Sequence, residues 1–116
     1  MTDRDRATDT RAATYGTLAP GRANHRQLQG LKGRWQEGTV RGRLVEAGWG
    51  EALGFPGLVL DPLVGPPVGV HLFESPDLHD HWSRLDAFEG IGYRRVVTRV
   101  RTADRELDAW IYVIPA

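Results

Sequence analysis

Two short segments of the sequence could take part in chemistry. One offers backbone N–H groups to a ligand, and the other carries a side chain that can exchange protons. Residues 15–18 have the sequence Tyr-Gly-Thr-Leu, and consecutive backbone N–H groups at the end of a strand can bind a carboxylate. Gly16 allows a ligand to approach this backbone closely. Glu89 lies at the C-terminal end of a predicted helix, where the helix dipole and the nearby Phe88 and Trp82 favour a raised pKa. A carboxyl with a raised pKa is suited to general acid–base catalysis.

Each of these residues also has an ordinary structural explanation. A Glu beside a Gly at the end of a helix is most often a solvated surface residue. A Tyr before a Gly turn commonly packs in the core, so we expect Tyr15 to pack while the backbone of Gly16, Thr17 and Leu18 binds. Tyr93 either hydrogen-bonds a ligand or packs in a strand with its hydroxyl in water.

Three other groups of residues are assigned no chemical role. His79 and His81 are two positions apart on the predicted helix, so they face different directions and cannot chelate a metal together. Arg94 and Arg95 are adjacent on a predicted strand, so at most one faces a site, and the default is a solvated edge. Core or loop anchoring is the expected role of Trp35, Trp49 and Trp110.

Six segments with apolar runs or alternation must form the strands that position these residues. The predicted strands cover residues 12–18, 39–45, 57–61, 68–73, 93–101 and 107–114. A hairpin turn at residues 102–105 joins the last two strands. We expect loops at residues 21–35, with a possible short helix, and at residues 46–56, where a long loop often lines a site.

One helix is predicted between the fourth and fifth strands. Ser75 is suited to be its N-cap, Pro76 favours the first helical position, and Gly90 is expected to end it. Spacings of four, three and three place one apolar stripe on the core, formed by Leu78, Trp82, Leu85 and Phe88. The polar residues, Asp86 among them, are expected mostly to face solvent.

The predicted elements do not alternate between strand and helix, which argues against a doubly wound parallel sheet. We therefore predict an α+β fold, a small mixed β-barrel of about six strands with one main helix packed beside it. One domain is expected over residues 12–116. Residues 1–11 alternate acids and bases, and we interpret them as a disordered tail.

The overall composition excludes several classes of protein. Lys and Arg number 15 and Asp and Glu also 15, so no long-range positive field would gather nucleic acid, and a small polar substrate fits better. The absence of Cys excludes disulfides, a thiolate nucleophile and thiolate zinc sites. Residues 1–11 contain no apolar run, which predicts neither a signal peptide nor a membrane span and favours a cytoplasmic protein.

The two chemical segments resemble the gamma-glutamylcyclotransferase-like family, of the avirulence-induced-gene-like, gamma-glutamylamine cyclotransferase type. Residues 15–18 look like its Tyr-Gly-Ser/Thr-Leu loop, and a following Gly and the pair Asn24-His25 continue the match. Residues 85–90, with the trailing Tyr-Arg of residues 93–94, are similar to its Leu-Asp-x-x-Glu-Gly motif. Weaker matches at residues 54–58 and 109–113 extend the resemblance over nearly everything but the tail.

The resemblance implies an enzyme, of acyltransferase or lyase type, that cyclises a γ-glutamyl amide or amine to 5-oxoproline and releases the free amine. Glu89 matches the family's catalytic residue, which implies the role of general acid/base. By the same resemblance, residues 15–18 and Tyr93 hold the substrate. No metal or organic cofactor is required, and the expected partner is a small γ-glutamyl compound, with no nucleic acid or membrane.

Two alternative functions stay open at this point. A non-catalytic module could keep the same pocket and bind a small metabolite, although the presence of Glu89 argues against it. A different amide-cleaving or lyase chemistry could also use the pocket. Where relatives often carry a basic residue after the Tyr-Gly-Thr-Leu loop, this chain has Ala19 and Pro20, which leaves the affinity for a carboxylate and the identity of the substrate open. The sequence also does not fix the leaving amine or the oligomeric state.

Overall fold

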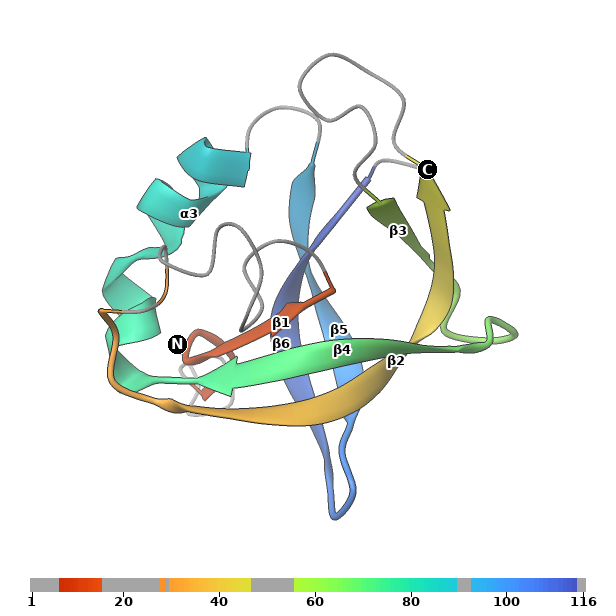
Figure 1. Ribbon diagram of the computed structural model, residues 1–116, viewed down its shortest axis with the longest axis horizontal. Helices are drawn as coiled ribbons and strands as arrows, with labels where there is room; N and C mark the ends of the chain where they lie inside the picture. The colour runs from red at the N-terminus through yellow and green to blue at the C-terminus, as the bar shows by residue number, and fades with distance from the viewer. Residues whose placement is uncertain (1–6, 16–27, 29, 47–55, 90–92, 115–116) are drawn as a thin grey trace.

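A computed structural model of the chain describes residues 7–15, 28, 30–46, 56–89 and 93–114 (Figure 1). The strands are β1 (Arg11–Thr14), β2 (Arg34–Glu46), β3 (Pro56–Leu60), β4 (Pro67–Glu74), β5 (Arg94–Arg101) and β6 (Glu106–Val113). Between β4 and β5 lie a short 3-10 helix, η2 (Pro76–Asp80), and the α-helix α3 (Trp82–Glu89). Among the described residues, no helix has the length and apolar composition needed to cross a membrane.

The strands form a closed barrel with one extra strand. Their order is β3-β2-β4-β1-β6-β5. β2 also pairs with β5 at Thr39 and Arg101, so the five strands β2, β4, β1, β6 and β5 form a closed barrel and β3 is the extra strand. At this point a Cβ atom on Gly38 would lie 2.9 Å from the Arg101 carbonyl oxygen, so only glycine lets the two strands meet. All strand pairs are antiparallel except β1 with β6. The predicted mixed barrel with one main helix beside it is confirmed.

The inside of the barrel is filled by one face of each strand. Alternate residues of β6 are buried, as expected for a strand whose two faces have different surroundings. This first core contains Ala13, Val40, Leu58, Val70, Leu72, Val100, Leu107, Ala109, Ile111 and Val113. The opposite face of β6 carries Trp110 and Tyr112, which pack against a second core.

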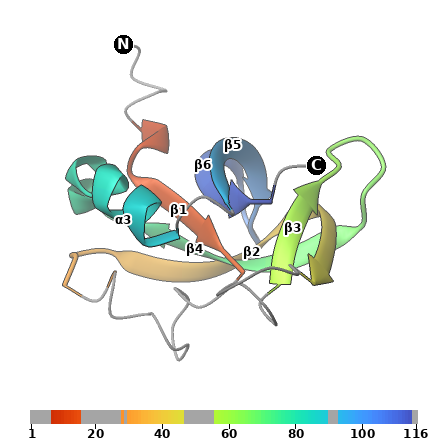
Figure 2. The ribbon, with the colours of Figure 1, turned by 90° about the horizontal axis from the view of Figure 1, so that it is seen from above.

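The second core lies between the outer wall of the barrel and the helices, and it contains Ala12, Leu28, Phe73, Leu78, Trp82 and Leu85. Seen from above, α3 lies at one side of the barrel and β3 at the other (Figure 2). Three buried side chains thus attach the helical segment to the outside of the barrel, Leu78 from η2 and Trp82 and Leu85 from α3.

The start of the helical segment follows the sequence signals, but the helix is broken in two. The Ser75 side chain accepts a hydrogen bond from the Asp77 N–H at 3.1 Å, with Pro76 in the first turn. Hydrogen bonds of the 3-10 type then connect Leu78 to Ser75 and His81 to Leu78, so α3 begins after His81. Phe88 was expected on the buried stripe, yet it is 38% exposed, because α3 turns this position away from the barrel.

Two boundaries also differ from the expectation. The loop predicted over residues 21–35 ends earlier, because Arg34 and Trp35 pair with β4 and the Trp35 ring stacks on Phe73 at 4.7 Å. Tertiary pairing here overrides a local sequence that is poor for a strand. Residues 7–11, which the sequence placed in the tail, are tied to the domain where described, since Asp9 accepts hydrogen bonds from the indoles of Trp82 and Trp110.

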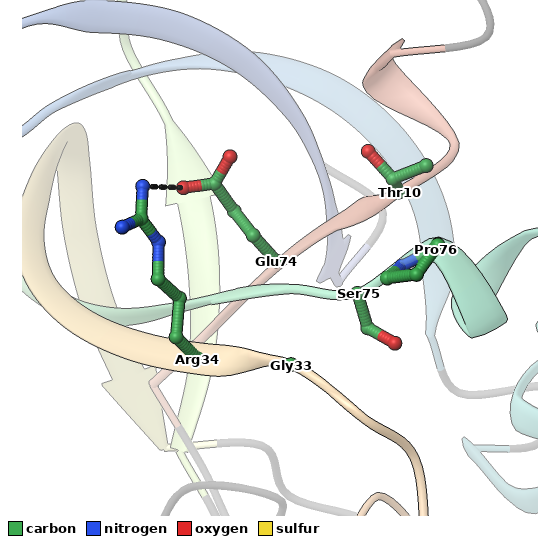
Figure 3. A pocket seen from close by; sticks show the side chains of 6 residues that line it. All are labelled: Thr10, Gly33, Arg34, Glu74, Ser75 and Pro76. Carbon is green, nitrogen blue, oxygen red and sulfur yellow. Dashed lines mark ion pairs between the residues drawn. The ribbon is translucent and has the colours of Figure 1, made fainter.

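A group of charges joins the starts of β1 and β2 to the end of β4. The Glu74 carboxylate forms ion pairs with Arg11 at 3.5 Å and Arg34 at 3.9 Å, and a short one with Arg105. Figure 3 shows Arg34 and Glu74 pointing toward one another beside a hollow of about 410 Å³. The Glu74 side chain is 19% exposed, so one carboxylate neutralises charge for three guanidinium groups in a partly buried place.

We expect Glu74→Gln to lower the free energy of unfolding by about 2 kcal/mol, between the values typical of exposed and of buried ion pairs. The change leaves three arginines without their shared carboxylate. Urea unfolding at pH 7 measures the effect. Glu106→Gln is the matched control, because Glu106 is 53% exposed and pairs with Arg101 at 3.4 Å. Equal losses in the two variants would show that the cluster adds nothing to a surface ion pair.

Candidate functional site

Glu89 is the last residue of α3 and its carboxyl is largely withdrawn from water. Burial raises the pKa of Glu89 to about 7, because removal from water disfavours the charged carboxylate. Among the described residues, no hydrogen-bond donor or cation contributes an opposing effect. The side chain can therefore hold or release a proton near neutral pH, as a general acid or base must.

Three tyrosine hydroxyls lie within electrostatic reach of Glu89. Tyr15 follows β1, Tyr93 precedes β5, and Tyr112 lies near the end of β6. Burial is the main cause of the raised pKa of each hydroxyl, and the charge of Glu89 raises it further in all three. The barrel thus brings together one carboxyl and three neutral hydroxyls from four separate segments.

The Tyr15 hydroxyl has a structural role that the sequence does not reveal. It donates a hydrogen bond to the Tyr112 carbonyl oxygen at 2.7 Å and accepts one from the Leu58 N–H at 3.0 Å. Since β3 and β6 are not paired in the sheet, this hydroxyl bridges them. Tyr15 therefore fixes the end of β1, from which the segment 16–18 continues.

A second network connects the helix to the β5–β6 hairpin. Asp86 accepts two hydrogen bonds from the Arg95 guanidinium, from Nε at 2.8 Å and from Nη2 at 3.1 Å. The Tyr112 hydroxyl donates to the same carboxylate at 2.7 Å. The hydrogen bonds from Arg95 are the main reason that the pKa of Asp86 is lowered. Asp86 therefore stays charged at neutral pH, whereas the pKa of Glu89, three residues later, is raised to about 7.

The structure brings Glu89, Tyr15 and Tyr93 together, as the sequence motifs imply. Gly16, Thr17 and Leu18, the other expected substrate-binding residues, lie outside the described residues. Sequence reasoning missed the contacts among Asp86, Arg95 and Tyr112. Asp86 does face solvent as expected, since its side chain is 44% exposed, but its carboxylate binds Arg95, which the sequence placed at a solvated edge. The signal was present in the Leu-Asp-x-x-Glu-Gly segment, whose Asp lies one helical turn before Glu89.

The hollows lined by described residues lie elsewhere on the molecule. One is the hollow beside Glu74 in Figure 3, and another, of about 670 Å³, lies between β4 and the β5–β6 turn, beside His71 and Arg101. Glu89 lines neither of these two hollows. Within the described ranges, no group of three or more His, Asp or Glu side chains is placed to hold a metal ion.

Burial of Glu89 predicts a pH-dependent stability. Between pH 4.5 and 7 the folded protein keeps the proton that the unfolded chain has lost, so stability falls as the pH rises through this window. Above it the penalty is constant at about 3 kcal/mol or less. We expect Glu89→Gln, which has no charge to bury, to be more stable than wild type by about 1–3 kcal/mol at pH 8.

The same difference should nearly vanish at pH 5, where the folded wild type also carries a neutral carboxyl. Urea unfolding curves of both proteins at pH 5 and pH 8 measure it. A stability difference that does not change with pH would show that Glu89 is not buried in its charged form.

The family described as gamma-glutamyl cyclotransferase, AIG2-like, matches residues 12–116. No curated protein sequence matches the chain significantly.

Several solved structures share the fold. The protein YkqA from Bacillus subtilis superposes with a TM-score of 0.70 at 25% identity over 90% of this chain, which spans 35% of the length of that protein. An AIG2-like protein from Mus musculus gives a TM-score of 0.70 at 23% identity, covering 90% of this chain and 76% of its own. Kluyveromyces lactis allophanate hydrolase gives 0.64 at 14% identity, covering 91% of this chain and 19% of its own. The last two likenesses concern the fold alone.

Proposed function

The chain belongs to the gamma-glutamyl cyclotransferase, AIG2-like family, and on this premise we propose that it cyclises a γ-glutamyl amide or amine to 5-oxoproline and releases the free amine. The family membership confirms the resemblance seen in the sequence. One observation carries the proposal for this chain. The matching glutamate, Glu89, is a partly buried carboxyl with a pKa raised to about 7, within electrostatic reach of Tyr15.

In the proposed reaction, the Glu89 carboxylate takes a proton from the α-ammonium group of the substrate. The freed amine attacks the γ-carbonyl carbon, and a new C–N bond closes the five-membered lactam. The original C–N bond then breaks, and the leaving nitrogen receives the proton held by Glu89. The regenerated Glu89 carboxylate takes the second proton of the ring nitrogen and passes it to the released amine, which leaves as an ammonium ion. No atom is oxidised or reduced, so the chain's own groups can account for each proton transfer.

Because ring closure is intramolecular, the main task of the protein is to hold the folded conformer of the substrate, with its amine beside the carbonyl carbon. We assign the backbone of Gly16, Thr17 and Leu18 to the substrate carboxylate and to the oxyanion that develops on the γ-carbonyl, where one donor typically contributes about 3 kcal/mol. Tyr15 anchors this segment through its two hydrogen bonds. The Tyr93 hydroxyl is assigned to the substrate.

The neutral hydroxyls around Glu89 suit this assignment. The raised pKa values of Tyr15, Tyr93 and Tyr112 keep all three protonated at neutral pH. Glu89 is therefore the group among these four that changes its protonation near pH 7. We expect the reaction to take place in the cytoplasm, on a small soluble γ-glutamyl compound.

Release of 5-oxoproline from a panel of γ-glutamyl amino acids and γ-glutamyl amines tests the proposal, with binding of each compound followed by calorimetry. Turnover of any member supports it, and the best leaving group identifies the substrate class. Binding without formation of 5-oxoproline would contradict it and would favour a non-catalytic binding module on the same pocket.

A further inference from the structure

We infer that Asp86, Arg95 and Tyr112 form a positioning network that fixes the last turn of α3, and with it the Glu89 carboxyl, against the β5–β6 hairpin. The network is defined by these three side chains. The kinetic part of this inference rests on the proposed function, whereas its structural part does not.

The contacts in the network are directional and mutually dependent. Arg95 presents Nε and Nη2 to the two oxygens of Asp86 at 2.8 and 3.1 Å, a two-pronged geometry that fixes orientation as well as distance. The Tyr112 hydroxyl adds a third hydrogen bond to Asp86 at 2.7 Å. Arg95 and Tyr112 are paired opposite each other on β5 and β6, so the hairpin holds the helix through one carboxylate.

The Arg95 guanidinium also lies over two indole rings. Its central carbon lies 4.6 Å from the ring centre of Trp82 and 4.3 Å from that of Trp110. A guanidinium stacks well on aromatic faces, which an ammonium group does less effectively. Since Trp82 and Asp86 belong to successive turns of α3, Arg95 contacts the helix at two points along its length.

Asp9 accepts hydrogen bonds from both of these indoles. Its backbone carbonyl accepts a hydrogen bond from the Trp82 indole at 2.8 Å, and its side chain accepts one from the Trp110 indole at 2.9 Å. A movement of α3 relative to the β5–β6 hairpin would therefore disturb the contacts of Arg95 with Trp82 and Asp86.

The position of Glu89 depends on these contacts because α3 has only 8 residues. Isolated helices of this length are unstable in water, and the last turn is the first to fray. Asp86 lies one turn before Glu89, so its three hydrogen bonds hold the part of the helix that would otherwise loosen. If that turn loosened, water would reach Glu89 and remove the burial on which its raised pKa depends.

The network also determines which groups face Glu89. Among the residues that the structure describes, the titrating groups near it are Tyr15, Tyr93 and Tyr112, together with Asp86 on its own helix. Tyr112 has a single hydroxyl proton, and the hydroxyl uses it in the hydrogen bond that it donates to Asp86. The Asp86 charge is in turn paired with Arg95. The network thereby leaves Glu89 without a donor from Tyr112 in this geometry.

The test compares Arg95→Lys with Arg99→Lys as a matched control. Arg99 lies on the same strand and pairs with Asp108 of β6 at 3.5 Å, but neither residue belongs to the network. Both variants keep the positive charge. We expect Arg95→Lys to lower kcat for 5-oxoproline formation by roughly tenfold to a hundredfold with little change in KM, since small displacements of a catalytic group cost rates of this order. Arg99→Lys should change neither value.

A second measurement does not depend on turnover. Titration of the Glu89 carboxyl carbon by NMR should give a midpoint of about 7 in wild type and in Arg99→Lys, and a midpoint lower by at least about one pH unit in Arg95→Lys, because the loosened turn is better hydrated. A role in stability alone would lower the melting temperature without moving this midpoint. An unchanged midpoint and kcat in a folded Arg95→Lys would overturn the inference.

The two measurements separate the inference from the proposed function. If wild type forms no 5-oxoproline but the midpoint still falls in Arg95→Lys, the network stands and the proposed reaction is wrong. If Arg95→Lys does not fold, Asp86→Asn takes its place, since it keeps the side-chain shape. The same direction of change in kcat and in the midpoint is expected for it, and no change in either would overturn the inference.

Discussion

Glu89→Gln is expected to lower kcat/KM for 5-oxoproline formation by a factor of roughly 10² to 10⁴, the usual contribution of a positioned general base. Glutamine keeps the length and shape of the side chain but cannot accept the proton of the substrate ammonium. Steady-state assays of the best compound from the γ-glutamyl panel measure the loss. The stability gain expected for this variant at pH 8 provides the control, because it shows that the protein is folded while activity is lost.

The pH dependence of kcat/KM in wild type is a second, independent test of Glu89 as the base. Only the carboxylate form of Glu89 can take the proton, and its pKa is raised to about 7. We therefore expect log kcat/KM to fall with a slope of about one per pH unit below pH 7 and to level off above it. A profile that stays flat down to pH 5 would contradict the assignment of Glu89 as the base, as would a Glu89→Gln variant with near-normal activity.

The second large effect is expected for Leu85→Ala. The Leu85 side chain is fully buried in the second core with Leu78 and Trp82. Its truncation removes buried methyl groups and leaves a cavity, which typically costs about 2–5 kcal/mol of the free energy of unfolding. Because Leu85 lies four residues before Glu89 on the same side of α3, the change should also displace the carboxyl. Urea unfolding and the 5-oxoproline assay measure both effects.

Phe88→Ala serves as the control for Leu85→Ala, since it removes a larger side chain from the same helix. Phe88 is 38% exposed, so we expect a loss of less than about 1 kcal/mol, as is usual for surface positions. A loss in Phe88→Ala as large as in Leu85→Ala would mean that α3 buries a different face from the one described.

Local patterns predicted the elements that depend on near neighbours. Alternation in residues 107–114 indicated β6, and the Ser-Pro pair at 75–76 indicated the start of the helical segment. The motif around Glu89 also pointed to a carboxyl of raised pKa. That expectation agrees in direction with the structure, although burial is the cause found, and Phe88, expected to help bury the carboxyl, is itself partly exposed.

Contacts between distant segments escaped prediction for a physical reason. Arg95 looked like a solvated residue because its partners, Trp82, Asp86 and Trp110, come from a helix and another strand. The first two residues of β2, Arg34 and Trp35, looked like a loop because only pairing with β4 makes them a strand. In both cases contacts with segments distant in the sequence stabilise the observed conformation, and local sequence propensity does not report such contacts.

The parallel pairing of β1 with β6 has a consequence for how the protein is made. Ala12 pairs with Trp110, and the hydrogen bond from Tyr15 to Tyr112 joins residues 97 positions apart. Domains dominated by such long-range contacts fold slowly, on a scale of roughly milliseconds to seconds. While the ribosome is still translating β6, the barrel lacks one wall and Tyr15 lacks its acceptor. A nascent chain can therefore acquire its site only after β6 has been synthesised and has emerged from the ribosome.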